Sequence, residues 1–350
     1  MGGTSLVQAT GSRPKIVVSG DGRGVVGHAS ARLLADVAEV TGLAAGFVQA
    51  LAPLRQRDRG HAPGRVALDV AVLLADSGEA ISDIAVLRDQ AELFGVVACD
   101  ATVWRVLDAV DAEAIAALRS ARAAARELAW AQRTETRGDG GGLPLSKAAD
   151  WEVPGLVIDI DASIVECHSE KENAAATWKK TFGYYPIFAF LDNTREALAG
   201  LLRKGNAGSG TAEDHVAVLD LALEQIPDAY RFGQDILIRA DSGCSRAFLA
   251  HIRGMRRFGM RTFFSVGVPV TQPIRDAIVH ASAWIPALDA DGELRDGAQV
   301  VAVPAHPGRD GAGLRLLARR LRAHPHARVR VLRDRGRQPL RPRAGHDGQP

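Results

Sequence analysis

The sequence has few cysteines and no apolar run long enough to span a bilayer. Its three cysteines, Cys99, Cys167 and Cys244, are far apart and form no Cys-x-x-Cys pair. This spacing suggests reduced thiols and argues against both a disulfide scaffold and a structural zinc site. The lack of a long apolar segment and of a charged-then-apolar leader predicts a cytoplasmic protein with no membrane-embedded part.

The formal net charge of the whole chain is only +2, but positive charge dominates its C-terminal end. From His306 onward there are twelve arginines and three acids, and no glutamate follows Glu293. Residues 301–350 use only nine amino-acid types, all of which have codons beginning with G or C. This alphabet fits an out-of-frame or degenerate tail, and it equally fits a genuine Arg/Pro-rich tail. Such a tail would bind nucleic acid without sequence preference.

The composition of the whole chain, 47% hydrophobic and 24% charged over 350 residues, is that of a globular protein with room for two or three domains. Apolar residues at three- and four-residue spacing, such as Ala31, Leu34, Val37 and Ala38, predict helices in the first third. Glycines and polar residues predict a linker in the middle. The predicted divisions are a disordered leader (1–14), a helical domain (15–133), the linker (134–150), a core domain (151–300) and the tail (301–350).

The second half of the chain predicts strands and helices in the order β-β-β-α-β-α-β. The strands are expected at 155–165, 171–185 with a turn, 187–191, 236–241 and 261–266, and the helices at 211–225 and 245–258. This order is that of a ribonuclease H-like core. The predicted fold class is therefore α/β: a ribonuclease H-like mixed sheet flanked by helices, preceded by an all-helical N-terminal domain.

Two strands of this core carry aspartates where an apolar strand would otherwise continue. Asp159 and Asp161 lie in the first strand, and Asp241 ends the fourth. Strand alternation puts Asp159 and Asp161 on one face. A divalent metal shared with Asp241 would offset the cost of burying these charges. Mg²⁺ or Mn²⁺ is the expected ion, because magnesium needs only one or two carboxylates besides phosphate and water. The alternative is that the acids end strands and bind nothing.

A series of short motifs runs through residues 16 to 300. They are Val18–Gly22, Ala80–Gln90, Thr102–Arg105, Ile158–Ser163, His168–Glu172, Phe182–Pro186, Leu202–Ser209 and Arg239–Ser242. In the content and order of these motifs the chain resembles the DDE transposases of bacterial insertion sequences, specifically the family numbered thirteen-eighty.

The resemblance implies a metal-dependent transposase in which Asp161, two residues before Ser163, is the first catalytic acid and Asp241 is the second. Asp159 would be a nearby backup ligand. Such enzymes hydrolyse a phosphodiester at the end of the element and then use the freed 3′ hydroxyl to attack target DNA. The implied partners are the terminal inverted repeats and target DNA, bound by a homodimer that assembles on DNA at the bacterial nucleoid.

The third acid of the family, a glutamate on a late helix, has no counterpart after Glu293. Residues 319–330 resemble an arginine-rich strand of the family but do not restore this glutamate. The sequence therefore predicts a chain that binds DNA and cleaves it poorly. A catalytically dead, DNA-binding transposase remnant is the alternative to an active enzyme.

Candidate DNA contacts lie in both halves of the chain. Basic residues near the acidic motifs are expected to contact phosphates, with a solvated face as the alternative. These residues are Lys171, Lys179, Lys180, Arg203 and Lys204. Residues 80–107 predict a helix-turn-helix whose recognition helix, 102–109, would use Thr102 and Arg105. The alternative there is a pair of core helices with Trp104 buried.

The spacing Gly22-x-Gly24-x-x-Gly27 after a short strand matches a dinucleotide-binding fingerprint. A nucleotide-binding oxidoreductase is therefore a second alternative, and it requires a parallel sheet within residues 29–130. Because helix follows helix in that region, no organic cofactor is predicted.

Overall fold

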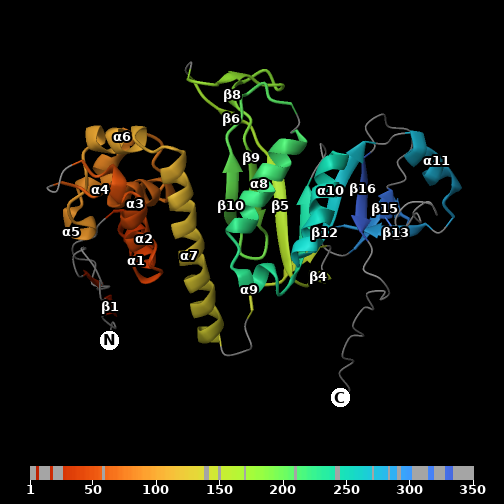
Figure 1. Cartoon of the computed structure of the whole chain (residues 1–350), viewed down its shortest axis with the longest axis horizontal. Coiled ribbons are helices and arrows are strands. Elements are labelled where there is room, and N and C mark those ends of the chain that lie inside the picture. Colours follow the sequence, from red (N-terminus) through yellow and green to blue (C-terminus); the bar gives the residue numbers. More distant parts are fainter. Residues whose placement is uncertain are drawn as a thin grey trace. The chain divides into compact units, whose positions relative to one another are not determined.

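The computed structural model describes residues 5–7, 16–18, 27–56, 60–137, 142–148, 151–168, 171–208, 211–240, 245–269, 272–282, 284–289, 293–301, 314–318 and 328–333 (Figure 1). The chain divides into two compact units: unit 1 is Met1–Leu143 with Glu224–Pro227, and unit 2 is Pro144–Leu223 with Asp228–Pro350. This division falls inside the predicted linker. The linker itself is shorter than predicted, because helix α7 continues to Arg137 and strand β3 begins at Ser146.

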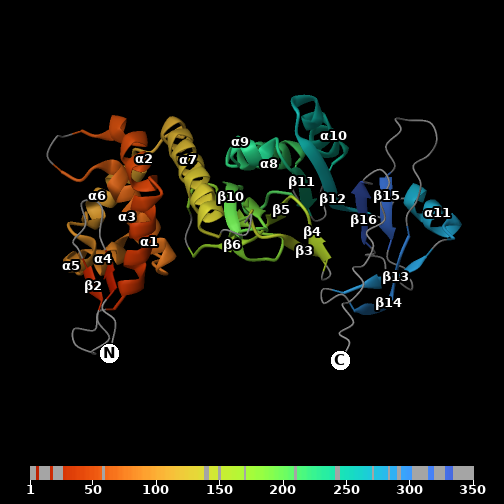
Figure 2. The same ribbon diagram turned by 90° about the horizontal axis from the view of Figure 1, so that it is seen from below.

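Unit 1 is helical across residues 27–56 and 60–137 (Figure 2). The elements are α1 (Ala29–Val40), α2 (Leu43–Ala50), η1 (Ala52–Leu54), α3 (Pro63–Ala75), η2 (Ile81–Ile84), α4 (Ala85–Arg88), α5 (Ala91–Phe94), α6 (Asp100–Asp108) and α7 (Ala112–Arg137). No strand occurs in these two ranges. The parallel sheet that the oxidoreductase alternative needs is therefore missing from them, and that alternative is rejected.

Part of the predicted disordered leader is a strand. β1 (Ser5–Val7) pairs antiparallel with β2 (Ile16–Val18). The rest of the leader, and Gly22 and Gly24 of the fingerprint, lie outside the described residues.

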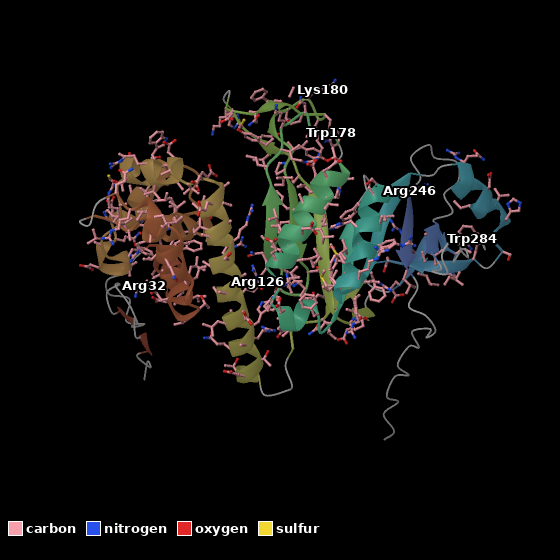
Figure 3. The ribbon with its side chains drawn as sticks, in the orientation of Figure 1. Arg32, Arg126, Trp178, Lys180, Arg246 and Trp284 are labelled. Carbon is pink, nitrogen blue, oxygen red and sulfur yellow. The ribbon has the colours of Figure 1, made fainter. Side chains whose placement is uncertain are left out.

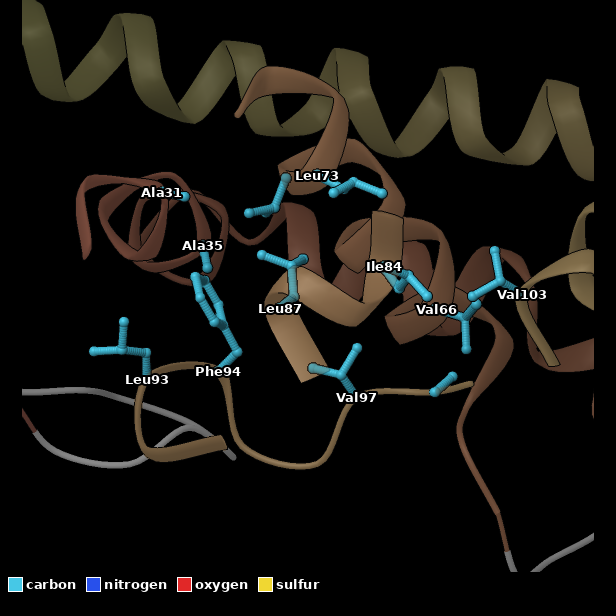
Figure 4. Packing of buried hydrophobic residues seen from close by; sticks show 12 residues of the cluster. Ala31, Ala35, Val66, Leu73, Ile84, Leu87, Leu93, Phe94, Val97 and Val103 are labelled. Carbon is cyan, nitrogen blue, oxygen red and sulfur yellow. The ribbon is translucent and has the colours of Figure 1, made fainter. Parts of the chain in front are cut away.

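One core of unit 1 packs α1 and α3 against the short elements that follow them (Figure 4). Phe94, Ile84 and Leu87 are fully buried in it. Arg32 of α1 is also buried, and its guanidinium donates to Asp36 at 2.8 Å and to the carbonyl of Leu93 at 2.5 Å. A buried charge is tolerated when it is paired and hydrogen-bonded in this way.

The main sheet of unit 2 has the strand order β10-β9-β5-β11-β12-β16-β15. Its strands are β5 (Leu156–Ala162), β9 (Ile187–Leu191), β10 (Glu196–Leu201), β11 (Asp235–Ala240), β12 (Arg261–Pro269), β15 (Leu314–Ala318) and β16 (Arg328–Arg333). The first three strands in sequence pair antiparallel, and β11 runs parallel to both β5 and β12. Numbered along the chain, the first five strands follow the 3-2-1-4-5 order of a ribonuclease H sheet. The predicted fold class is confirmed.

One member of the core sheet differs from the prediction. The segment 171–185, expected as the second core strand, instead holds β7 (Ala175–Ala176) and β8 (Phe182–Tyr184), which form a separate small sheet with β6 (Val165–Glu166). The third core strand is β10, which was not predicted. Its sequence, Glu-Ala-Leu-Ala-Gly-Leu, is rich in helix-favouring residues, and it forms the sheet edge, where tertiary pairing with β9 overrides propensity.

Helices α8 (Ala212–Glu224) and α10 (Arg246–Gly254) lie on the same side of the sheet in Figures 1 and 2. Both connect parallel strands in the same direction across the sheet, so right-handed crossovers bring them to one face. Ile158, Ile160, Ile236 and Ile238 alternate along β5 and β11 and are buried. The partly exposed residues between them share the opposite face.

Further described elements of unit 2 lie around the main sheet. They are β3 (Ser146–Ala148), β4 (Trp151–Val153), α9 (Asp228–Arg231), η3 (Met255–Phe258), α11 (Gln272–His280), β13 (Ile285–Leu288) and β14 (Leu294–Val300). Strands β15 and β16 belong to the stretch predicted as a tail and extend the main sheet beyond β12.

Replacing Gly205 by alanine is expected to destabilise unit 2 by about 2–3 kcal/mol, whereas Gly208→Ala should change stability by less than about 0.5 kcal/mol. A Cβ on Gly205 would lie 2.2 Å from the carbonyl oxygen of Ala175 and 2.3 Å from that of Gly183, both on the small sheet. A Cβ on Gly208 meets nothing within 4 Å. Urea unfolding of both variants measures the difference, and equal stabilities would contradict the close approach.

Candidate active site and nucleic-acid contacts

Asp161 lies near the end of β5, with its side chain exposed. One carboxylate oxygen accepts a hydrogen bond from the backbone N–H of Ala162 at 2.8 Å. Its register partner on β9 is Phe188. An exposed carboxylate at the end of a central strand is accessible to a cation and to a phosphate substrate.

Asp159 lies two residues earlier on the same face and binds Arg239, its register partner on β11. The guanidinium donates from Nε to Oδ1 at 2.5 Å and from Nη2 to Oδ2 at 2.6 Å. Nη2 also lies 3.1 Å from Oδ2 of Asp192, which follows β9. The hydrogen bond to Asp159, with the charges of both aspartates, raises the pKa of Arg239. Both oxygens of Asp159 are thus engaged by a cation of the protein itself.

Asp241 lies outside the described residues. The last register pair between β5 and β11 is Ile160 with Ala240, and each of these two residues is followed in the sequence by an aspartate. Within the described ranges, no cluster of three or more His, Cys, Asp or Glu residues that could hold a metal ion is found.

The basic candidates divide into exposed and buried residues. Lys171, Lys179, Lys180 and Lys204 are exposed. The first three belong to the segment that forms the small sheet, and Lys204 forms an isolated bridge with Tyr184 of β8. Their side chains are available to a phosphate backbone.

Arg203 is different, because its side chain is buried. It donates to the carbonyl of Tyr185 at 3.0 Å and pairs with Asp214 at 3.0 Å. These contacts join the small sheet to the start of α8. The sequence did not distinguish this arginine from the neighbouring Lys204.

In unit 1, Thr102 and Arg105 lie together on α6. Arg105 donates to the hydroxyl of Thr102 at 3.0 Å and to the carbonyl of Ala101 at 3.0 Å. Trp104 on the same helix is 56% exposed, whereas Val103 is buried. The alternative that placed Trp104 in a core is therefore wrong, and α6 presents a surface with an aromatic and a basic side chain.

Cys99 immediately precedes α6 and is exposed. A side-chain hydrogen bond with Thr102 lowers the pKa of this thiol. The greater thiolate fraction makes Cys99 a chemical probe at the start of this helix.

Sequence reasoning missed Arg239 and Asp192 as members of the acidic site. A signal was present for Arg239, because it lies two residues before Asp241 in the strand that the sequence predicts, and residues two apart in a strand share a face. Its pairing with Asp159 depends on the register between β5 and β11, which the sequence does not state.

The sequence of the chain matches a known protein family. Residues 8–291 match the family described as Transposase DDE domain group 1. The match covers more than half of the chain, and the chain belongs to this family.

Two solved structures are similar to parts of the chain. The piggyBac transposase synaptic complex with hairpin DNA is 12% identical, with a TM-score of 0.38, covering 88% of this chain and 63% of that chain. The Argonaute of Aquifex aeolicus is 13% identical, with a TM-score of 0.25, covering 70% and 29%. The chain thus spans less than two thirds of either one. No curated protein matches it.

Among the helices of the described residues, none is by itself long and apolar enough to cross a membrane. Helices α1 and α2 pass that test only when taken together, and a bend of 73° separates them.

Proposed function

We propose that this protein is a transposase of the insertion-sequence family thirteen-eighty, a family whose members cleave and join DNA at the ends of their elements. Membership of a DDE transposase family supports this reading. The observation that carries the site is the register of the central strands, in which Ile160 and Ala240 pair and each is followed by an aspartate. Asp161 and Asp241 are the catalytic acids of the proposal.

Asp161 and Asp241 would hold Mg²⁺ or Mn²⁺, which would stabilise charge on the reacting phosphate. The exposed carboxylate of Asp161 is a donor of the kind that these ions prefer. Asp159 serves the site indirectly, because Arg239 engages its carboxylate. Asp159 thereby balances the positive charge of Arg239 close to the proposed catalytic acids.

DNA would be bound by both units, through α6 in unit 1 and the exposed lysines of unit 2. The exposed Trp104 and Arg105 support α6 as the helix that recognises the terminal inverted repeats. Lys171, Lys179 and Lys180 would contact phosphates of the element or the target. We further propose that the protein acts as a homodimer assembled on DNA at the nucleoid.

A catalytically dead DNA-binding remnant is the second candidate function. It is favoured by the lack of any glutamate after Glu293, since the family uses a late glutamate as its third acid. Such a protein would occupy element ends without cutting them. We expect the 350-residue chain to bind DNA with little cleavage.

The test uses a supercoiled plasmid that carries the DNA flanking the gene of this chain, incubated with the full chain and Mg²⁺. Specific binding with little end cleavage is expected. A version extended in the alternative reading frame, if it gains a late glutamate, should cleave. Robust cleavage by the 350-residue form would show that another residue supplies the third acid. Equal affinity for end-containing and scrambled duplexes would refute specific recognition.

Alkylation of Cys99 gives that experiment a readout localised to α6. The lowered pKa of this exposed thiol favours its reaction with iodoacetamide at mildly alkaline pH. DNA with element ends should slow its modification several-fold more than a scrambled duplex does. Equal modification rates with the two DNAs would mean that α6 does not bind the element ends specifically.

A further inference from the structure

The small sheet of unit 2 presents an exposed tryptophan at its tip. Strands β7 and β8 are joined by residues 177–181, with the sequence Thr-Trp-Lys-Lys-Thr. Trp178 is 67% exposed, and Lys179 and Lys180 on the same turn are exposed as well. Figure 3 labels Trp178 and Lys180 in this part of unit 2. A tryptophan so exposed is a candidate contact with a partner, because aromatic side chains are enriched at binding surfaces.

Hydrogen bonds between the two ends of the turn hold its shape. The N–H of Thr177 donates to the carbonyl of Thr181 at 2.7 Å, and the two threonine hydroxyls lie 2.8 Å apart. The N–H of Lys180 donates to the carbonyl of Thr177 at 2.9 Å, and Lys180 adopts a φ of 65°. A non-glycine residue keeps this backbone conformation only where its surroundings enforce it. The tryptophan is therefore carried on a preformed turn.

The charge of the turn is of one sign, with two lysines and no acid. The Nζ of Lys179 lies 5.2 Å from the centroid of the Trp178 ring, in a cation–π contact. An aromatic ring beside ammonium groups matches a nucleic-acid strand with an unpaired base, because the ring stacks on the base while the ammonium groups contact phosphates.

The small sheet that carries the turn is connected to the main sheet at the end where Asp161 lies. Ala162 of β5 pairs with Ile187 of β9, and the N–H of Ser163 donates to the carbonyl of Pro186 at 3.1 Å. The small sheet is inserted between these strands. Thr181 is five residues before Pro186, so an extended chain places it at most about 17 Å from Pro186. This distance corresponds to about five nucleotides along one DNA strand.

We infer that Trp178 stacks on an unpaired base of the DNA strand close to the cleavage site, with Lys179 and Lys180 on the adjoining phosphates. This inference rests on the proposed function and adds to it the form of DNA that the small sheet recognises. Duplex ends opened next to a cut, or a base extruded from the duplex, would supply the unpaired base.

The test measures the affinity of the full chain for a 20-nucleotide oligo(dT) and for a 20-base-pair duplex, using fluorescently labelled DNA. Trp178→Ala is expected to weaken oligo(dT) binding about 5- to 150-fold, the equivalent of one stacked base, with a much smaller effect on the duplex. Trp178→Phe should recover much of the loss, because phenylalanine also stacks. Phe258→Ala is the matched control, since Phe258 is a 75% exposed aromatic residue of unit 2 away from this turn.

Tryptophan emission supplies an independent readout on the same samples. Oligo(dT) should quench the emission of the wild-type chain, and Trp178→Phe should remove part of that quenching. Wild-type affinity for oligo(dT) in Trp178→Ala would overturn the inference while leaving the proposed function intact. Loss of self-association in that variant, with DNA binding unchanged, would assign Trp178 to a protein contact and would also overturn it. A wild-type chain that binds neither DNA would refute both proposals.

Discussion

Replacing Asp161 by asparagine is expected to weaken Mn²⁺ binding by at least about 100-fold. Loss of an outer-shell partner of a metal ligand typically costs about 10- to 100-fold in affinity, and loss of a direct charged ligand costs more. Asp161 is exposed, and the structure gives its carboxylate only a local contact with the backbone of Ala162 among the described residues. A titration that follows the electron paramagnetic resonance signal of free Mn²⁺ measures the affinity directly.

The matched variant is Asp159→Asn, which makes the same chemical change two residues away. It should alter Mn²⁺ affinity by no more than about 7-fold, because one charge roughly 7 Å from a divalent ion in water contributes about 1.2 kcal/mol. Any end cleavage by the wild-type chain should disappear in Asp161→Asn, because the variant lacks the carboxylate proposed as the first catalytic acid. Each 1.36 kcal/mol of transition-state stabilisation lost in this way lowers the rate about tenfold. If Asp159→Asn removes the metal and Asp161→Asn does not, the first acid has been assigned to the wrong residue.

Replacing Arg239 by methionine is expected to lower the stability of unit 2 by about 1–3 kcal/mol. Breaking a buried ion pair from one side costs about 3–5 kcal/mol, and the partial exposure of this site reduces that figure. The side chains of Arg239, Asp159 and Asp192 are 20%, 34% and 32% exposed. The variant leaves two neighbouring carboxylates without their shared cation. Urea unfolding at neutral pH measures the change.

The pH dependence of this contribution follows from the raised pKa of Arg239. A folded-state pKa above the unfolded value means that the stabilisation is complete below the ordinary arginine pKa and is lost only as the pH rises through the folded value. The effect of Arg239→Met should therefore be fully present at neutral pH.

Two controls separate the ion cluster from a general effect of removing an arginine. Arg261→Met removes an ion-pair partner of Asp235 at the other end of β11, where Arg261 is 59% exposed, and should cost less than about 1 kcal/mol. The double variant Asp159→Asn with Arg239→Met should be less destabilised than the sum of the two single variants, since the residues are in direct contact. Additive losses would contradict the pairing.

Periodicity predicted the helices of unit 1 better than it predicted their buried faces. The apolar series that begins at Ala31 indicated a helix, and α1 covers it. The apolar side chains that this helix buries are small, at Ala31, Ala35 and Ala38, while Leu34 and Val37 are 44% and 56% exposed. Spacing identifies a helix, but the neighbouring elements decide which part of its surface is covered.

The same distinction applies to the lysines and arginines of unit 2. Lys204 and Arg203 are adjacent basic residues, and both were expected to contact phosphates. Arg203 is instead buried against Asp214 and the carbonyl of Tyr185, whereas Lys204 is exposed. Nothing in the local sequence separates them, because burial depends on the approach of α8 and of the small sheet.

The sequence by itself determined the ribonuclease H-like class of unit 2, the helical character of unit 1, and Asp161 as the leading candidate for the first acid. These conclusions rest on local information: strand alternation, helix periodicity and short ordered motifs. The tertiary structure decided that β10 completes the core sheet, that 171–185 forms a small separate sheet, and that Arg239 engages Asp159. Each of these depends on pairing between strands distant in sequence, and register and edge position are properties of the assembled sheet.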